Sequence, residues 1–220
     1  MRPGGGGARV IAILGAESTG KSTLAHDLAA ALQADGLQAR RIDEHLREFC
    51  DRHGRTPRRD EQAAIAAEQT RRIVAARDAR LPPADVVVAD TTALMTAVYS
   101  ELVFGDRSLH PGALAAHRAT VDLTLVMALD LPWVADGLQR DGPQVRAPVD
   151  RLLRGMLLDA GLGFSVIAGQ GPERLAAARR AFEALSRQGR ARPAGSWKHH
   201  CGRCGDPDCE RHGLRNAPGM

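Results

Sequence analysis

The chain has 220 residues and a formal net charge of +4, and 44% of its residues are hydrophobic while only 3% are aromatic. This length allows one α/β domain with a small appendage, whose core must be built from aliphatic side chains. The charge suits phosphorylated ligands but does not by itself indicate nucleic acid. No apolar run approaches the ~20 residues that span a bilayer. We therefore expect a cytoplasmic protein that does not enter a membrane, with residues 1–8 as a flexible leader and not a signal peptide.

Short branched apolar runs alternate with longer stretches of helical periodicity along most of the chain. Strands are expected over residues 10–14, 37–42, 84–90, 123–129 and 164–168. Helices are expected over 21–34, from 45 to at least 50, over 60–80, from 93 onward, and over 111–118, 149–160 and 172–186. Because strands alternate with helices, the chain is predicted to form an α/β domain over residues 9–187, with a mostly parallel sheet covered on both faces.

The stretch Gly15–Ser22, with the sequence GAESTGKS, fits the phosphate-loop pattern G-x-x-x-x-G-K-[ST] at every fixed position. Its glycines permit backbone turns that let successive N–H groups face one phosphate, and the following helix adds its N-terminal partial charge. Lys21 is expected to reach the β- and γ-phosphates of ATP, and the Ser22 hydroxyl to ligate Mg²⁺. The predicted nucleotide-binding residues are Gly15, Glu17, Ser18, Thr19, Gly20, Lys21, Ser22 and Thr23.

Acidic residues follow two of the predicted strands, at the edge where ligands bind in parallel sheets. Asp90 ends a valine-rich run and is expected to organise Mg²⁺, although a helix cap or a solvated turn would also explain it. Asp43 and Glu44 follow the second strand, and one of them would position or deprotonate the attacking hydroxyl. Their adjacency leaves open which of the two carboxylates faces the site.

Residues 130–148 form a polar segment with two glycines and three prolines, and it carries Arg140 and Arg146. A long irregular segment late in a phosphate-binding fold is typical of a mobile lid. Arg140 is a candidate for stabilising charge on the transferring phosphoryl group, and Arg146 for contacting the nucleotide. The alternative is a solvated basic loop.

These segments together resemble the NadR-like nicotinamide-riboside kinase domain, a P-loop ATPase family of AAA type, over residues 10 to 185. The similar stretches are GAESTGKST at 15–23, EHLRE at 44–48, DTT at 90–92 and LPWVADGLQR at 131–140. The resemblance implies five parallel strands with the phosphate-loop strand central. It also implies transfer of the ATP γ-phosphate to the 5′-hydroxyl of a nucleoside such as nicotinamide riboside. The family carries an aromatic residue where this chain has His45 and Leu46.

Beyond residue 187 the composition shifts to Arg, Gly, Pro and Ala, which is typical of a linker. Cys201, Cys204, Cys209 and His212 then lie within a short span that suits a structural Zn²⁺ site. A disordered tail with reduced cysteines is the alternative. Basic residues beside these ligands suggest contact with nucleic acid or a partner protein. This tail motivates a second functional hypothesis, a regulatory ATP-binding module that acts on a partner bound through residues 188–220.

Overall fold

The computed structural model describes residues 7–134 and 142–188 of the chain, and residues as far as Ser186 belong to one compact unit. Its centre is a parallel sheet with the strand order β2-β3-β1-β4-β5. The strands are β1 (Arg9–Leu14), β2 (Ala39–Ile42), β3 (Val86–Asp90), β4 (Leu123–Met127) and β5 (Ser165–Ile167). The predicted α/β fold with five parallel strands and a central phosphate-loop strand is therefore confirmed.

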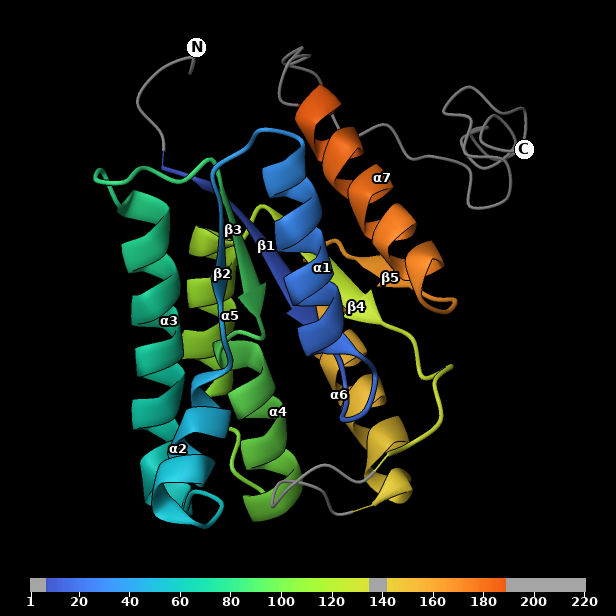
Figure 1. The fold of residues 1–220 in the computed structure, drawn as a ribbon. Helices are drawn as coiled ribbons and strands as arrows, with labels where there is room; N and C mark the ends of the chain where they lie inside the picture. Colours follow the sequence, from blue (N-terminus) through green and yellow to red (C-terminus); the bar gives the residue numbers. More distant parts are fainter. Residues whose placement is uncertain (1–6, 135–141, 189–220) are drawn as a thin grey trace, which may run out of the picture. The chain divides into compact units, whose positions relative to one another are not determined.

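Helices cover both faces of this sheet. They are α1 (Lys21–Ala34), α2 (His45–His53), α3 (Gln62–Asp78), α4 (Ala93–Phe104), α5 (His110–Thr120), α6 (Arg146–Asp159) and α7 (Pro172–Gln188), with short 3-10 helices η1 (Arg59–Glu61) and η3 (Pro143–Val145). Helices α1 and α7 lie over one face, and α3, α4, α5 and α6 lie over the other (Figure 1). Among the described helices, none is long and apolar enough to cross a membrane.

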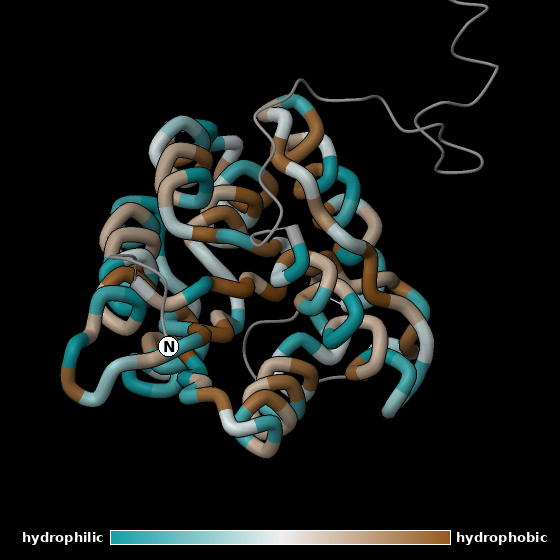
Figure 2. Tube along the Cα trace, turned by 90° about the horizontal axis from the view of Figure 1, so that it is seen from above, coloured by the Kyte–Doolittle hydropathy of each residue, from teal (hydrophilic) through white to brown (hydrophobic). Residues whose placement is uncertain are grey.

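Alternating side chains of β1 supply the core on each face of the sheet. Ile11 and Ile13 pack with α1 and α7, whereas Ala12 and Leu14 pack with the helices of the opposite face. All four are fully buried, as expected for a central strand whose successive side chains point to opposite faces. Seen from above, the helices combine hydrophobic and hydrophilic residues turn by turn, which fits helices with one face against the sheet (Figure 2).

The register of the strands brings the ends of four segments to one edge. Ile13 of β1 pairs with Asp90 of β3, and Leu14 pairs with Val126 of β4. Ile42, the last residue of β2, pairs with Ala89. The residues that follow these strands therefore meet at the carboxyl edge, where open α/β sheets bind their ligands.

The expectation that residues 130–148 form one irregular segment is wrong in its last part. The 3-10 helix η3 begins at Pro143, and α6 begins at Arg146, three residues earlier than the sequence pattern indicates. Pro148 obscured this start because proline usually signals a break, yet the first turn of a helix tolerates it.

Candidate functional site

The phosphate loop joins the buried strand β1 to the start of α1. Gly20 adopts a left-handed conformation (φ 78°) immediately before Lys21, and Gly15 has φ 147°. A Cβ at Gly15 would lie 3.0 Å from Met127 Cβ, so a side chain there would strain both the backbone and the packing. Since Gly20 has no side chain with which to cap α1, the first N–H groups of the helix remain available to an anion.

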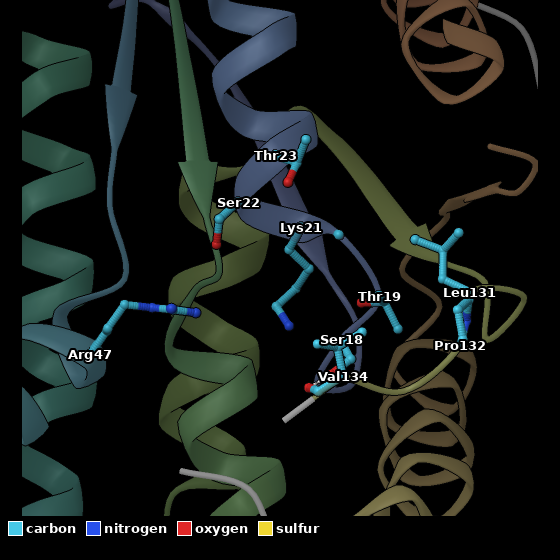
Figure 3. A pocket seen from close by; sticks show the side chains of 10 residues that line it. Ser18, Thr19, Lys21, Ser22, Thr23, Arg47, Leu131, Pro132 and Val134 are labelled. Atoms are coloured by element: carbon cyan, nitrogen blue, oxygen red, sulfur yellow. Dashed lines mark hydrogen bonds between the residues drawn. The ribbon is translucent and has the colours of Figure 1, made fainter. Parts of the chain in front are cut away.

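A cavity of about 630 Å³ opens over this loop. Its lining consists of Ser18, Thr19, Gly20, Lys21, Ser22, Thr23, Arg47, Leu131, Pro132 and Val134. Figure 3 shows Lys21 extending from the start of α1 and Arg47 extending from α2 toward the phosphate loop. The cavity therefore combines backbone donors, hydroxyl groups and two cationic side chains, a set that suits a polyphosphate.

Lys21 is one of the two cationic side chains that line this cavity. Its Nζ donates a hydrogen bond to the Ala16 carbonyl (2.8 Å). Burial lowers the pKa of Lys21 from its ordinary value of 10.5, while the carboxylates of Glu44, Asp90 and Glu17, in decreasing order, act to raise it. Three acidic groups from three different segments thus lie close enough to Lys21 to act on its charge.

Asp90 carries a buried carboxylate at the tip of β3. It is 3% exposed, and its Oδ1 has no hydrogen-bond donor within the part of the chain that the structure describes. Such a buried acceptor calls for a ligand, an ion or water. Asp90 and the cavity-lining Ser22 offer only oxygen atoms, which is the chemistry of a Mg²⁺ site completed by nucleotide phosphates. The residues present therefore fit this ion.

Within residues 7–134 and 142–188, no group of three or more His, Cys, Asp or Glu side chains is arranged to hold a metal ion by itself. The four predicted Zn²⁺ ligands, Cys201, Cys204, Cys209 and His212, lie outside the described residues, so the zinc site stays a prediction.

The residue after Asp90 has a strained backbone. Thr91 has φ 72°, the left-handed region that a β-branched residue rarely adopts. Such a conformation costs on the order of 1–3 kcal/mol and is typical of functional sites. The Thr91 N–H donates to the Ile13 carbonyl (3.1 Å), which fixes the end of β3 against the strand that leads into the phosphate loop.

The structure separates the two adjacent acids after β2. Asp43 pairs with Arg41 (2.7 Å from Nε to Oδ1) and its side chain is 57% exposed. Glu44 precedes α2, has a side chain only 13% exposed and lies 3.9 Å from Arg47. Of all charged groups that act on Lys21, Glu44 has the largest effect. Glu44 is therefore brought to the site, whereas Asp43 is not.

A buried glutamine ties the start of α2 to the tip of β3. Gln69 of α3 is 2% exposed, and its Oε1 accepts a hydrogen bond from the His45 N–H (2.8 Å). Its Nε2 lies 3.5 Å from the Thr91 carbonyl, which makes a weak second contact. His45 follows Glu44, and Thr91 follows Asp90. The Gln69 side chain therefore connects the backbone next to Glu44 with the backbone next to Asp90.

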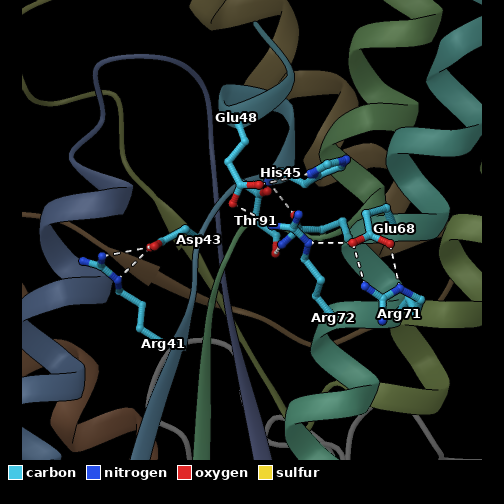
Figure 4. A network of polar contacts seen from close by, with 9 residues as sticks. Arg41, Asp43, His45, Glu48, Glu68, Arg71, Arg72 and Thr91 are labelled. Atoms are coloured by element: carbon cyan, nitrogen blue, oxygen red, sulfur yellow. Dashed lines mark hydrogen bonds and ion pairs between the residues drawn. The ribbon is translucent and has the colours of Figure 1, made fainter. Parts of the chain in front are cut away.

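Ion pairs reinforce this junction between α2 and α3. Arg72 contacts Glu48 (2.6 Å) and Glu68 (2.8 Å), as Figure 4 shows, while the Arg41–Asp43 pair lies apart. Hydrogen bonds from Arg71 and Arg72 lower the pKa of Glu68 to about 2. These pairs are partly exposed and therefore add little to stability. We infer that the Arg72–Glu48 pair mainly orients α2 against α3.

On the other side of the phosphate loop, a buried arginine of α7 contacts the loop backbone. Arg174 is 5% exposed. Its Nη1 donates to the Thr19 carbonyl, its Nη2 to Asp130, and its Nε to the Gly169 carbonyl (2.7 Å). The sequence analysis missed Arg174, Asp130 and Gln69. Only their contacts in the fold distinguish them from the many other polar residues of the chain.

The segment after β4 is tied to both the phosphate loop and α6. The Ser18 hydroxyl donates to the Val134 carbonyl (2.7 Å). Arg146 is 8% exposed, and its Nη1 donates to the Leu131 carbonyl (2.9 Å). Arg146 thus lies in a helix and contacts backbone, and the lining of the cavity, so far as the structure describes it, does not include this residue. Arg140 lies outside the described residues.

Comparison with solved structures finds the same fold in NadR proteins. One solved in complex with NAD and AMP-PNP has 22% sequence identity and a TM-score of 0.67, with 86% of this chain and 52% of that chain covered. Another in complex with NR has 21% identity and a TM-score of 0.63, with 86% and 54% covered. The chain therefore spans about half the length of these proteins. Comparison with curated protein sequences gave no match.

A protein-family model also matches most of the chain. The family AAA_28, described as an AAA domain, matches residues 10–174, which begin in β1 and end at Arg174. These residues include the phosphate loop, Glu44, Asp90 and the described lining of the cavity. Taken with the five-stranded fold, this match shows that the chain belongs to the AAA_28 family of AAA domains and is a P-loop nucleotide-binding domain similar to NadR.

Proposed function

We propose that the protein is a kinase that transfers the γ-phosphate of Mg·ATP to the 5′-hydroxyl of a nucleoside such as nicotinamide riboside. The observation that carries this proposal is the buried Asp90 carboxylate at the carboxyl edge of the sheet, one oxygen of which has no donor in the described structure, while Glu44 and Glu17 also act on the charge of Lys21. Phosphate binding alone does not need three carboxylates there, whereas phosphoryl transfer needs groups for the metal and for the acceptor hydroxyl. The NadR complexes with AMP-PNP and with NR support the same choice of ligands.

Each group has a distinct role in this proposal. Lys21 and the N–H groups of the loop hold the phosphates, and Ser22 and Asp90 hold Mg²⁺, which supplies neutralisation of phosphate charge. Glu44 accepts the proton of the acceptor hydroxyl. The oxygen of that hydroxyl bonds to the γ-phosphorus while the bond between the γ-phosphorus and the ADP oxygen breaks. Arg47 lies beside Glu44 and lines the cavity, where it can contact the phosphate or the acceptor.

Two predicted arginines complete the proposal. Arg140 is proposed to stabilise the charge of the transferring group. Arg146 would then support the segment that precedes Arg140 by holding the Leu131 carbonyl, and its predicted contact with the nucleotide would be indirect.

The test is a phosphorylation assay with Mg·ATP and a panel of nucleosides that includes nicotinamide riboside, read by mass spectrometry of the products. We expect one nucleoside to gain a single phosphate while ADP forms in equal amount. Absence of any phosphorylated product, with ATP binding retained, would contradict the proposal.

Adjacent acids provide a matched pair of variants. Glu44→Gln removes a proton acceptor at the site, and we expect the rate of transfer to fall by about 10²–10⁴-fold. Asp43→Asn makes the same chemical change one residue away, at a carboxylate that pairs with Arg41, and should leave the rate within a few-fold of wild type. Equal losses in both variants would remove the basis for assigning the role to Glu44.

The Cys/His cluster beyond residue 187 supports a second candidate, a nucleotide-dependent regulator that contacts a partner through a Zn²⁺-bound tail. Metal analysis of the purified protein tests the first half, with one Zn²⁺ per chain expected. Truncation after Arg187 tests the second half. Under this candidate, ATP binding persists in the truncated protein and partner or nucleic-acid capture is lost, whereas the kinase proposal requires transfer to survive truncation.

A further inference from the structure

The carbonyl group of Thr19 belongs to the phosphate loop, yet it is held by a side chain from the far end of the sequence. Arg174 donates to it through Nη1, and a Cβ built on Gly20 would lie 3.4 Å from the same nitrogen. The guanidinium group therefore contacts the backbone of the loop directly. It is itself buried, at 5% exposure, so it lies behind the loop and away from solvent.

One peptide group connects this contact to the phosphate side of the loop. The Thr19 carbonyl and the Gly20 N–H belong to the same planar trans peptide, and they point in opposite directions. A donor that holds the carbonyl on the side of α7 therefore turns the Gly20 N–H away from α7. Glycine at position 20 offers little resistance to rotation of this peptide, because glycine adopts positive and negative φ with similar ease.

The arginine is in turn fixed by an acidic partner and by backbone. Its Nη2 donates to Asp130 Oδ1, and its Nε donates to the Gly169 carbonyl (2.7 Å). The other oxygen of Asp130 accepts the Gly169 N–H (2.7 Å), so the arrangement closes on itself. A buried guanidinium needs such a counter-charge, and its planar fork is well suited to several acceptors at fixed angles.

We infer that Arg174 is a positioning residue that holds the Thr19–Gly20 peptide in the orientation in which the Gly20 N–H faces the bound phosphates, with Asp130 holding Arg174 in place. The inference rests on the nucleotide-binding part of the proposed function and does not involve the acceptor. Its physical consequence is preorganisation, since a loop that is already oriented loses less conformational freedom when the nucleotide binds.

The experiment measures the dissociation constant for Mg·ATP by calorimetry in the full chain. Arg174→Lys keeps the charge but loses the planar fork, and we expect it to weaken ATP binding by about tenfold or more, the equivalent of one charge-assisted hydrogen bond. Arg179→Lys is the matched control on the same helix, because Arg179 pairs with Asp35 (2.7 Å) at the end of α1 that lies away from the loop. Affinity in this control should equal that of the wild type.

A second measurement reports on the Gly20 amide itself. We expect its ¹⁵N–¹H resonance to shift strongly when ATP is added to wild-type protein, and to shift differently or broaden in Arg174→Lys. Asp130→Asn, which retains the guanidinium but weakens its anchor, should fall between wild type and Arg174→Lys in both measurements. It also serves if Arg174→Lys does not fold. Wild-type affinity in folded Arg174→Lys, or an unmoved Gly20 resonance in wild type saturated with ATP, overturns the inference.

These outcomes separate the inference from the kinase proposal. Wild-type protein that binds ATP but phosphorylates no nucleoside contradicts the kinase proposal and leaves the role of Arg174 intact. Conversely, transfer and ATP affinity that both survive Arg174→Lys overturn the positioning role while the kinase proposal stands.

Discussion

Charged side chains beside the phosphate loop fall into two groups with different hydrogen bonding. We call Glu44 and Asp90 the α2 flank, and Asp130 and Arg174 the α7 flank. On the α2 flank, Glu44 and Asp90 act on a single lysine, and Asp90 Oδ1 is buried without a hydrogen-bond donor in the described structure. On the α7 flank, Asp130 and Arg174 bond to each other and to backbone. The polar groups of the α7 flank satisfy one another and can serve as support. On the α2 flank, by contrast, Asp90 Oδ1 still has capacity for an ion such as Mg²⁺ in the described structure.

The largest effect should come from removing the charge that the α2 flank surrounds. Lys21→Met keeps the stem of the side chain and removes the ammonium, so the phosphates lose a charged donor while the nearby carboxylates remain. We expect kcat/KM for phosphoryl transfer to fall by about 10²–10³-fold, and ATP affinity to fall with it. Steady-state kinetics and calorimetry on the same preparation measure the two effects.

The pKa of Lys21 provides a further check, measured in the wild-type protein. The sequence contains two lysines, Lys21 and Lys198, so the methylated amine signals in NMR can be assigned with one variant. Lys21 should titrate below its ordinary 10.5 because of burial. Bound ATP favours the ammonium, so affinity should weaken as the pH rises through this lowered value. Titration at or above 10.5 in the free protein would mean that the nearby carboxylates outweigh desolvation at Lys21.

The next largest effect is a loss of stability in acid that is caused by a buried histidine. His117 of α5 lies between Thr92, which follows β3, and Thr124 of β4, with ring nitrogens 3.3 and 2.8 Å from the two hydroxyls. Burial lowers the pKa of His117 from 6.5 to about 4. The unfolded chain therefore binds this proton more tightly than the folded one between these values. Stability should be complete above pH 6.5 and fall by about 3 kcal/mol as the pH decreases to 4.

Chemical denaturation at several pH values measures this loss. Carboxylates that pair in the folded state also lose stability in acid, so the wild-type slope alone is not specific. His117→Gln retains groups that can bond to both threonines and cannot titrate. Its free energy of unfolding should therefore fall less steeply between pH 6.5 and 4, and a slope equal to that of the wild type would contradict the buried, neutral histidine.

The two flanks also differ in how far the sequence could predict them. The loop, the parallel strands and the acidic strand tips follow from local patterns, because glycine spacing and valine-rich runs have local physical causes. The sequence could not distinguish Asp43 from Glu44, because both directly follow β2. Their environments differ only because α2 begins at His45, which makes Glu44 the N-cap residue of this helix. Arg174 lies 155 residues from Thr19, and no local pattern reports such a contact.

The smallest effect tests whether the α2 flank depends on its own support, as the α7 flank does. Gln69→Leu keeps roughly the volume but leaves the His45 N–H without its acceptor, which should cost about 1–3 kcal/mol of unfolding free energy. Because Glu44 precedes His45, the transfer rate should fall several-fold while the ATP dissociation constant stays unchanged.

Gln33→Leu is the control, since it removes an amide contact to the Ala39 carbonyl at the opposite end of β2. It should lower stability slightly without affecting kcat. If Gln69→Leu weakened ATP binding as much as transfer, the glutamine would support the whole loop, and the division of labour between the flanks would not hold. A loss confined to kcat would instead show that Gln69 supports the acceptor chemistry of Glu44 and not the binding of the nucleotide.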